Sequence, residues 1–185
     1  RKISSINIKQ LYKISPLGTF SMFCTGFIHS SLFTLGAVYA AKINFSIFEI
    51  SLFLFIISIS GAFFQWPIGY ISDKVDRRIV LVGVTFIASG LSLFIVASSY
   101  ISLVIFFILL AIYAGMSLPM YSLTIAHTND FLQQNEIVGA SATISILVGV
   151  GSICGPIIAS FFMSIIGPDG FFIYLFIVHA LLGLF

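Results

Sequence analysis

The stretch QWPIGYISDKVDRR, residues 65–78, decides the fold of this chain because it gathers five charged residues between two long apolar segments. The uncharged runs 50–72 and 79–129 flank these charges and contain no Asp, Glu, Lys or Arg. An apolar run of about 20 residues is long enough to cross a hydrocarbon core of roughly 30 Å as a helix. The stretch therefore predicts a charged loop between two membrane-spanning helices.

The composition of the whole chain agrees with a membrane location. Hydrophobic residues make up 59% of the 185 residues and charged residues only 8%, and the mean hydropathy is +1.18. Soluble domains carry about 25% charged residues, so this chain lies outside their range. The net charge of +2 forms no basic face, which argues against a nucleic-acid partner and leaves the lipid bilayer as the expected surroundings.

The uncharged runs predict six crossings. The run 79–129 is too long for one helix, and Ser98, Ser99 and Tyr100 supply a polar break within it. Continuously apolar runs favour helices, because the strands of a membrane barrel alternate over about 10 residues. The predicted helices cover residues 16–41, 47–70, 79–98, 101–125, 138–166 and 171–185. The fold class expected is thus an all-α integral membrane bundle of six transmembrane helices.

The distribution of Lys and Arg predicts the orientation of this bundle. Seven of these residues fall on one side of the predicted membrane: Arg1, Lys2, Lys9, Lys13, Lys74, Arg77 and Arg78. Only Lys42 falls on the other side. Because cytoplasmic loops carry an excess of Lys and Arg, residues 1–15 and the loop 71–78 are expected in the cytoplasm, with the chain in a plasma membrane such as the bacterial inner membrane.

The two ends predict a longer protein. The chain opens without an initiator Met or a cleavable signal pattern, and the last predicted helix is only about 15 residues long, short of a full crossing. Residues 1–15 are therefore expected to be the end of a cytoplasmic linker that follows further helices.

The charged loop fits a known signature. Its residues Gly69, Asp73, Lys74, Arg77 and Arg78 fit G-x-x-x-D-[RK]-x-G-[RK]-[RK], the cytoplasmic loop signature of the major facilitator superfamily. Asp76 stands where the signature has Gly. On physical grounds alone, a glycine permits close helix approach and the cations hold the loop at the lipid headgroups. A simple positive-inside anchor is the alternative interpretation of the three cations.

Further segments resemble the second half of the YcaD-like branch of this superfamily. They are QWPIG at 65–69, AHTND at 126–130 and the run from Gly155 to Phe185, in that order. The resemblance implies that these six helices are the seventh to twelfth of a twelve-helix fold, whose missing N-terminal half is a partner. It also implies a secondary transporter, not an enzyme, that moves a small molecule by alternating access and needs no cofactor. The charged loop would then be a conformational latch.

Polar residues at mid-helix predict where the substrate binds. No charged residue lies there, so any carboxylate for ion or proton coupling is expected in the other half. The candidates for the cavity are His29, Gln65, Tyr113, Ser117 and Tyr121, of which the last three recur at helical spacing. Structural alternatives stay open for them: a core histidine bonded to a carbonyl, a tyrosine at the interface, or an amide that holds helices together.

Small residues and proline predict how two of the helices behave. Gly151 and Gly155 recur at four-residue spacing, and Pro156 follows as a kink, so this face is expected to pack closely against another helix. Pro119 is expected to bend the helix 101–125. Cys24 and Cys154 lack metal-ligand spacing, so no metal site is predicted.

Two other classes of protein remain to be weighed. Ser141 in GASA and His179 in a later helix have the residue types of a rhomboid intramembrane serine protease, although that motif would need a final Gly. A six-helix channel or scaffold rests on the helix count alone, because no filter-like loop interrupts the helices.

Overall fold

The computed structural model describes residues 6–185, and every regular element within that range is an α-helix. The helices are α1 (Ile8–Ile14), α2 (Pro16–Lys42), α3 (Ile47–Ser72), α4 (Arg77–Ser99), α5 (Leu103–Ser117), α6 (Met120–Asn129), α7 (Ile137–Ile166) and α8 (Gly170–Leu184). The all-α prediction is confirmed.

Five stretches of the described chain are long and apolar enough to cross a membrane. These are α2, α3, α4, α7 and the pair α5–α6 taken together as Leu103–Asn129. The expected count of six uniform crossings is therefore not exact. Helix α8 is apolar but has only 15 residues, about 22 Å of helix, and the fourth predicted crossing is two helices rather than one.

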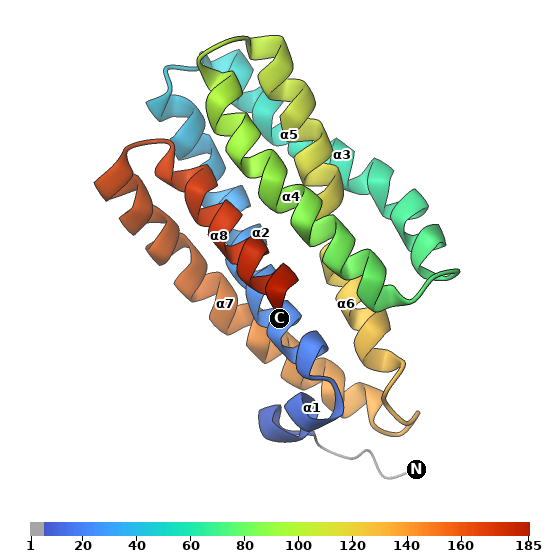
Figure 1. Cartoon of the computed structure of the whole chain (residues 1–185). Coiled ribbons are helices and arrows are strands. Elements are labelled where there is room, and N and C mark those ends of the chain that lie inside the picture. Colours follow the sequence, from blue (N-terminus) through green and yellow to red (C-terminus); the bar gives the residue numbers. More distant parts are fainter. Residues whose placement is uncertain (1–5) are drawn as a thin grey trace.

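Figure 1 shows α2 to α8 as one bundle of roughly aligned helices. Helix α1 and the α3–α4 and α6–α7 connections lie at one end, here named the α1 end, and the α2–α3, α4–α5 and α7–α8 connections lie at the opposite end. The principal neighbours are α2 with α7, α4 with α8, and α5 with both α3 and α4. Segments far apart in the chain are thus brought together along the whole length of the bundle.

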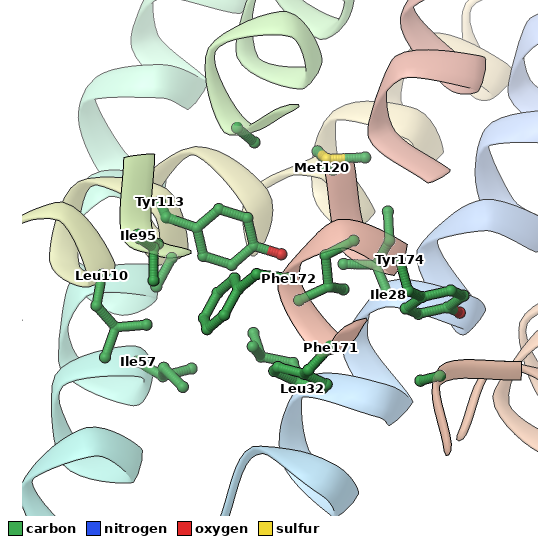
Figure 2. Close-up of a cluster of buried hydrophobic side chains, with 14 of the residues drawn as sticks. Ile28, Leu32, Ile57, Ile95, Leu110, Tyr113, Met120, Phe171, Phe172 and Tyr174 are labelled. Carbon is green, nitrogen blue, oxygen red and sulfur yellow. The ribbon is translucent and has the colours of Figure 1, made fainter. Parts of the chain in front are cut away.

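The core of the bundle is aromatic. The ring of Tyr39 lies 5.0 Å from that of Phe172, 5.4 Å from that of Phe171 and 6.4 Å from that of Phe106, measured between centroids. Figure 2 shows the same cluster around Phe172, whose ring meets Tyr113 edge-on at 5.8 Å. Lipid tails are as apolar as these side chains, so close contact rather than water exclusion holds the cluster together.

The closest helix pair is α2 with α7, and glycines make the approach possible. A Cβ placed on Gly26 would lie 2.3 Å from the Val148 carbonyl oxygen, and one on Gly151 would lie 2.4 Å from that of Phe23. At Gly155, which precedes the kink residue Pro156, the same test gives 2.5 Å to the Phe27 carbonyl oxygen. The two backbones therefore touch along this face.

Candidate functional site

The charges of the α3–α4 loop form a bridge between three helix ends. Arg77 Nη2 donates to Asp73 Oδ1 at 2.9 Å, and Arg77 Nη1 donates to Asp130 Oδ1 at 3.0 Å. Asp73 caps the end of α3, Arg77 begins α4 and Asp130 follows α6. A single guanidinium thus joins α3, α4 and α6 at the α1 end, and an open hollow of about 410 Å³ lies beside it.

The other residues of the signature make different contacts. Lys74 Nζ donates to the Tyr70 hydroxyl and lies 4.1 Å from the centre of that ring. The side chain of Arg78 is exposed and makes no ion pair within residues 6–185. The space beside Gly69 is open, since no heavy atom of the described chain comes within 4 Å of a Cβ placed there. A close approach at Gly69 therefore stays a prediction.

Asp76, the departure from the signature, caps helix α4. Its Oδ1 accepts from the Arg78 backbone N–H at 2.9 Å, and its φ of −52° and ψ of 119° are open to any residue. Both Asp and Gly are favoured at the N-cap, Asp through this hydrogen bond. Either the glycine of the signature or Asp76 can therefore act as the N-cap residue of α4.

A second polar cluster lies deep in the bundle and joins α2, α5 and α8. His29 Nε2 lies 3.2 Å from the Ser117 carbonyl oxygen, and the Ser117 hydroxyl lies 3.1 Å from His179 Nε2. His179 Nδ1 lies 2.8 Å from the Leu175 carbonyl oxygen. Because carbonyls only accept, His29 donates through Nε2–H and His179 through Nδ1–H, so His179 Nε2 accepts from Ser117.

This cluster marks the break between α5 and α6. Helix α5 ends at Ser117, Pro119 follows, and α6 begins at Met120. Proline has no N–H and its ring clashes with the preceding turn, so the helical hydrogen bonding is interrupted here, while Leu118 and Pro119 keep right-handed helical dihedral angles. Carbonyls freed by such an interruption at membrane depth need other donors, and His29 supplies one to the Ser117 carbonyl.

The structure brings three of the five predicted cavity residues together. Ser117 and Tyr113 are fully buried, His29 is half-buried, and the Tyr113 ring meets the His179 ring at 5.6 Å. Gln65 and Tyr121 are exposed on the surface of the described bundle and make no hydrogen bond or ring contact with this cluster.

Sequence reasoning missed His179 as a member of this cluster. It considered His179 only as a partner for Ser141, whereas the structure bonds it to Ser117. Ser141 Oγ instead donates to the Ile137 carbonyl of its own helix at 2.8 Å and is exposed. A histidine in an otherwise apolar membrane helix is itself a signal of function, and this signal could have identified His179 as a candidate residue. The protease arrangement therefore has no support.

At the end opposite α1, one hydrogen bond ties two turns together. The hydroxyl of Tyr100, after α4, donates to Asp169 Oδ2, before α8, at 2.5 Å. This hydrogen bond and the negative charge of Asp169 raise the pKa of Tyr100. The tie holds the ends of α4 and α8, two principal neighbours in the bundle.

A bundle of apolar helices with a broken helix inside and a cation-rich loop at one end is typical of membrane transporters. The family profile of the Major Facilitator Superfamily matches residues 17–185, so the chain belongs to that superfamily and is an integral membrane protein. This confirms the resemblance drawn from the charged loop.

Two curated relatives are similar to the chain over part of their length. An uncharacterized MFS-type transporter, YfkF of Bacillus subtilis (strain 168), is 30% identical over 142 residues, which cover 75% of this chain and 35% of YfkF. An uncharacterized MFS-type transporter, YcaD of Escherichia fergusonii, is 23% identical over 156 residues, covering 84% of this chain and 40% of YcaD. No solved structure matches the chain significantly. The chain thus spans well under half the length of these relatives.

Proposed function

We propose that this chain is the six-helix C-terminal half of a secondary active transporter, which moves a small solute by alternating access and is coupled to an ion or a proton. Membership of the superfamily supports a role in transport, and the coverage of the relatives fits one half of a longer carrier. The missing N-terminal half is then its partner, and the substrate binds between the two halves.

The observation that carries this proposal is the broken helix α5–α6. Its ends meet at Leu118 and Pro119 inside the bundle, where His29 of α2 bonds the Ser117 carbonyl. Transporters place such breaks where helices bind a substrate or change shape.

Among the predicted cavity residues, half-buried His29 and exposed Gln65 and Tyr121 are the ones proposed to be able to reach a substrate between the halves. Tyr113 and Ser117 are fully buried and are proposed to support His29 from within this half.

The charged loop supports a gating role. Arg77 holds the ends of α3, α4 and α6 in one arrangement through Asp73 and Asp130, and this bridge can break without disturbing the apolar core. We infer that Gly69, Asp73, Lys74, Arg77 and Arg78 form a latch that favours one conformation of the carrier. Contact between this loop and the opposite half is part of the proposal.

The positive-inside rule supports an orientation for the carrier. Within the described residues, Lys9, Lys13, Lys74, Arg77 and Arg78 lie toward the α1 end, and Lys42 lies at the opposite end. The α1 end is therefore proposed to face the cytoplasm, with the protein in the plasma membrane, of the inner-membrane type in a bacterium.

The test is transport by the full-length protein in liposomes. Uptake of a panel of radiolabelled solutes is measured with an imposed pH gradient, with a sodium gradient and with neither. The proposal predicts that one gradient drives uptake of some solute and that the uptake saturates. An ionic conductance that does not saturate, with no gradient-driven uptake, would refute the carrier and favour a channel.

A further inference from the structure

A seam of polar side chains between α2 and α6 runs from His29 toward the α1 end. Three of its hydroxyls, those of Ser21 and Thr25 on α2 and Thr124 on α6, belong to residues at most 1% exposed. None of the three has a hydrogen-bond partner within residues 6–185. Buried polar groups in native proteins are paired with other protein groups or with ordered water. Water is therefore the natural hydrogen-bond partner for these three hydroxyls.

Buried serine and threonine hydroxyls elsewhere in the bundle behave differently, although the hydroxyls of Tyr39 and Tyr113 are also unpaired within residues 6–185. Thr19 and Ser31 of α2 donate to the carbonyls of Ser15 and Phe27 one turn earlier, as hydroxyls in membrane helices commonly do. Ser92 of α4 does the same. The unpaired hydroxyls of the seam are thus not a general property of helices in this chain.

Two contacts fix how the helices of the seam face each other. His29 meets Ser117 at one end, and at the other end a Cβ placed on Gly18 would lie 2.2 Å from Thr128 Oγ1. The number of residues from Gly18 to His29 equals the number from Ser117 to Thr128. The two helical segments that form the seam therefore run antiparallel and stay level with each other along its length. Thr124 therefore lies level with the turn that joins Ser21 to Thr25.

His29 has one nitrogen free to take up a proton at the inner end of the seam. Its Nε2–H is donated to the Ser117 carbonyl, and its Nδ1 makes no hydrogen bond to any described residue. Both nitrogens of His179 are engaged, with Leu175 and Ser117. His29 can therefore become an imidazolium by taking a proton directly at Nδ1, whereas a proton on His179 Nε2 would require the Ser117 hydroxyl to reverse from donor to acceptor.

The surroundings of His29 contain no fixed charge at its depth. Segment 50–69 of α3 has no titratable side chain. The titratable groups on the elements around α2 are Tyr12, Lys9 and Lys13 of α1, Glu49 and Tyr70 near the ends of α3, Tyr113 of α5, Tyr121 and His127 of α6, Cys154 of α7, and Tyr174 and His179 of α8, with Cys24, Tyr39 and Lys42 on α2 itself. A proton on His29 would therefore meet no Asp, Glu, Lys or Arg side chain at its own depth.

We propose, on the basis of the transport function above, that this seam is a water-filled proton path in the state open at the α1 end, and that His29 is the residue that takes the proton. Water enters between α2 and α6 and bonds to Ser21, Thr25 and Thr124. A hydronium ion gives its proton to His29 Nδ1, and the same N–H bond breaks when the proton returns to water. No other bond changes.

Thiol accessibility tests the path without reference to transport. In the full-length protein with native cysteines replaced, Thr25→Cys and Thr124→Cys are treated in membrane vesicles with the charged reagent 2-aminoethyl methanethiosulfonate. The control is Ala88→Cys on α4, which is equally buried but lies outside the seam. Both seam positions are expected to react about a hundredfold faster than the control, because a charged reagent is excluded from a dry apolar core. Equal rates would overturn the path.

Proton movement tests the role of His29. Liposomes that hold the full-length protein and the pH dye pyranine are given a potassium diffusion potential with valinomycin, so that the proton itself is the probe. Proton entry is expected to exceed that of protein-free liposomes and to fall at least about tenfold in His29→Gln and in Thr124→Val. Ser58→Ala is the control, because Ser58 is an exposed α3 hydroxyl bonded to its own helix.

The outcomes separate this inference from the proposed function. Proton entry that is unchanged in His29→Gln, or no faster in wild type than in protein-free liposomes, overturns the proton role. Saturable solute uptake together with an unreactive seam overturns only the path. The absence of any gradient-driven solute uptake overturns the carrier, whatever the thiol reactions show.

Discussion

Arg77 and Asp130 are 53 residues apart in the chain, yet the guanidinium of the first lies 3.0 Å from the carboxylate of the second. The pair joins the start of α4 to the end of α6, and Asp73 adds the end of α3. The side chain of Arg77 is 25% exposed and that of Asp130 50% exposed, so solvent weakens the attraction. An ion pair of this kind contributes about 0.2–1 kcal/mol.

Arg77→Gln is expected to shift the balance between inward- and outward-facing states of the full-length carrier by roughly 1.4- to fivefold, which is the ratio that corresponds to this free energy at 25 °C. Spin-label distances between the two halves measure that balance. Asp130→Asn should give a similar shift, and the double substitution little more than either alone.

Lys74→Gln is the comparison variant within the proposed latch, because it separates the ion pairs of Arg77 from the positive charge of the loop. It removes one positive charge from the same loop, but Lys74 contacts Tyr70 and no carboxylate of the described chain. If Arg77→Gln and Lys74→Gln shift the balance equally, the loop acts only as a positive-inside anchor.

Gly151 is expected to tolerate no side chain. In Gly151→Ala the new Cβ would lie 2.4 Å from the Phe23 carbonyl oxygen, so α2 and α7 must separate. Such overpacking costs about 1–3 kcal/mol in the free energy of unfolding. Gly149→Ala on the same helix is the control, because nothing lies within 4 Å of a Cβ there. Thermal unfolding in detergent should show a lower midpoint for Gly151→Ala, and an unchanged or higher one for Gly149→Ala.

The sequence predicted the spanning helices well, because absence of charge is the property that the membrane selects. It predicted a bend at Pro119, where the structure interrupts the helical hydrogen bonding but keeps helical dihedral angles at Leu118 and Pro119. It did not predict the His29 donor, because that contact depends on how α2 packs against the junction. Helix α1 was missed although Asn7 and Gln10 form a capping box there, a pattern visible in the sequence.

The site was harder to predict than the fold. Helical spacing could group Tyr113 with Ser117, which lie one turn apart on the same helix. It could not pair Ser117 with His179, 62 residues away, because that contact depends on how α5 and α8 pack. Apolar residues surround every helix here, so periodicity gives little information about which face meets which neighbour.

Asp76 is expected to act on the stability of α4 rather than on switching. Asp76→Ala removes the oxygen that accepts from the Arg78 N–H and should lower the free energy of unfolding by about 0.5–2 kcal/mol. Asp76→Gly, which restores the family signature, should cost only a few tenths of a kcal/mol. Denaturant unfolding and the spin-label distances together check this. Tighter latching in Asp76→Gly would show instead that the departure tunes the transport cycle.

His29 is expected to matter for transport and not for the amount of protein made. His29→Ala leaves the Ser117 carbonyl without its donor at the helix break, and the loss of one hydrogen bond of about 0.5–1.5 kcal/mol predicts uptake lowered roughly two- to tenfold. Uptake and membrane protein level are measured together at several pH values. Normal uptake at every pH would remove His29 from the site.

His29→Gln distinguishes a structural role of His29 from a chemical one. The glutamine amide can donate to the Ser117 carbonyl, but it cannot carry a proton between pH 5 and 8. If His29 only holds the break between α5 and α6, His29→Gln should restore the uptake that His29→Ala loses. If His29 takes up the coupling proton, uptake driven by a pH gradient should stay as low in His29→Gln as in His29→Ala, while thermal stability returns to that of the wild type. Thr34→Ala, an exposed change on the same helix, should leave both measurements unchanged.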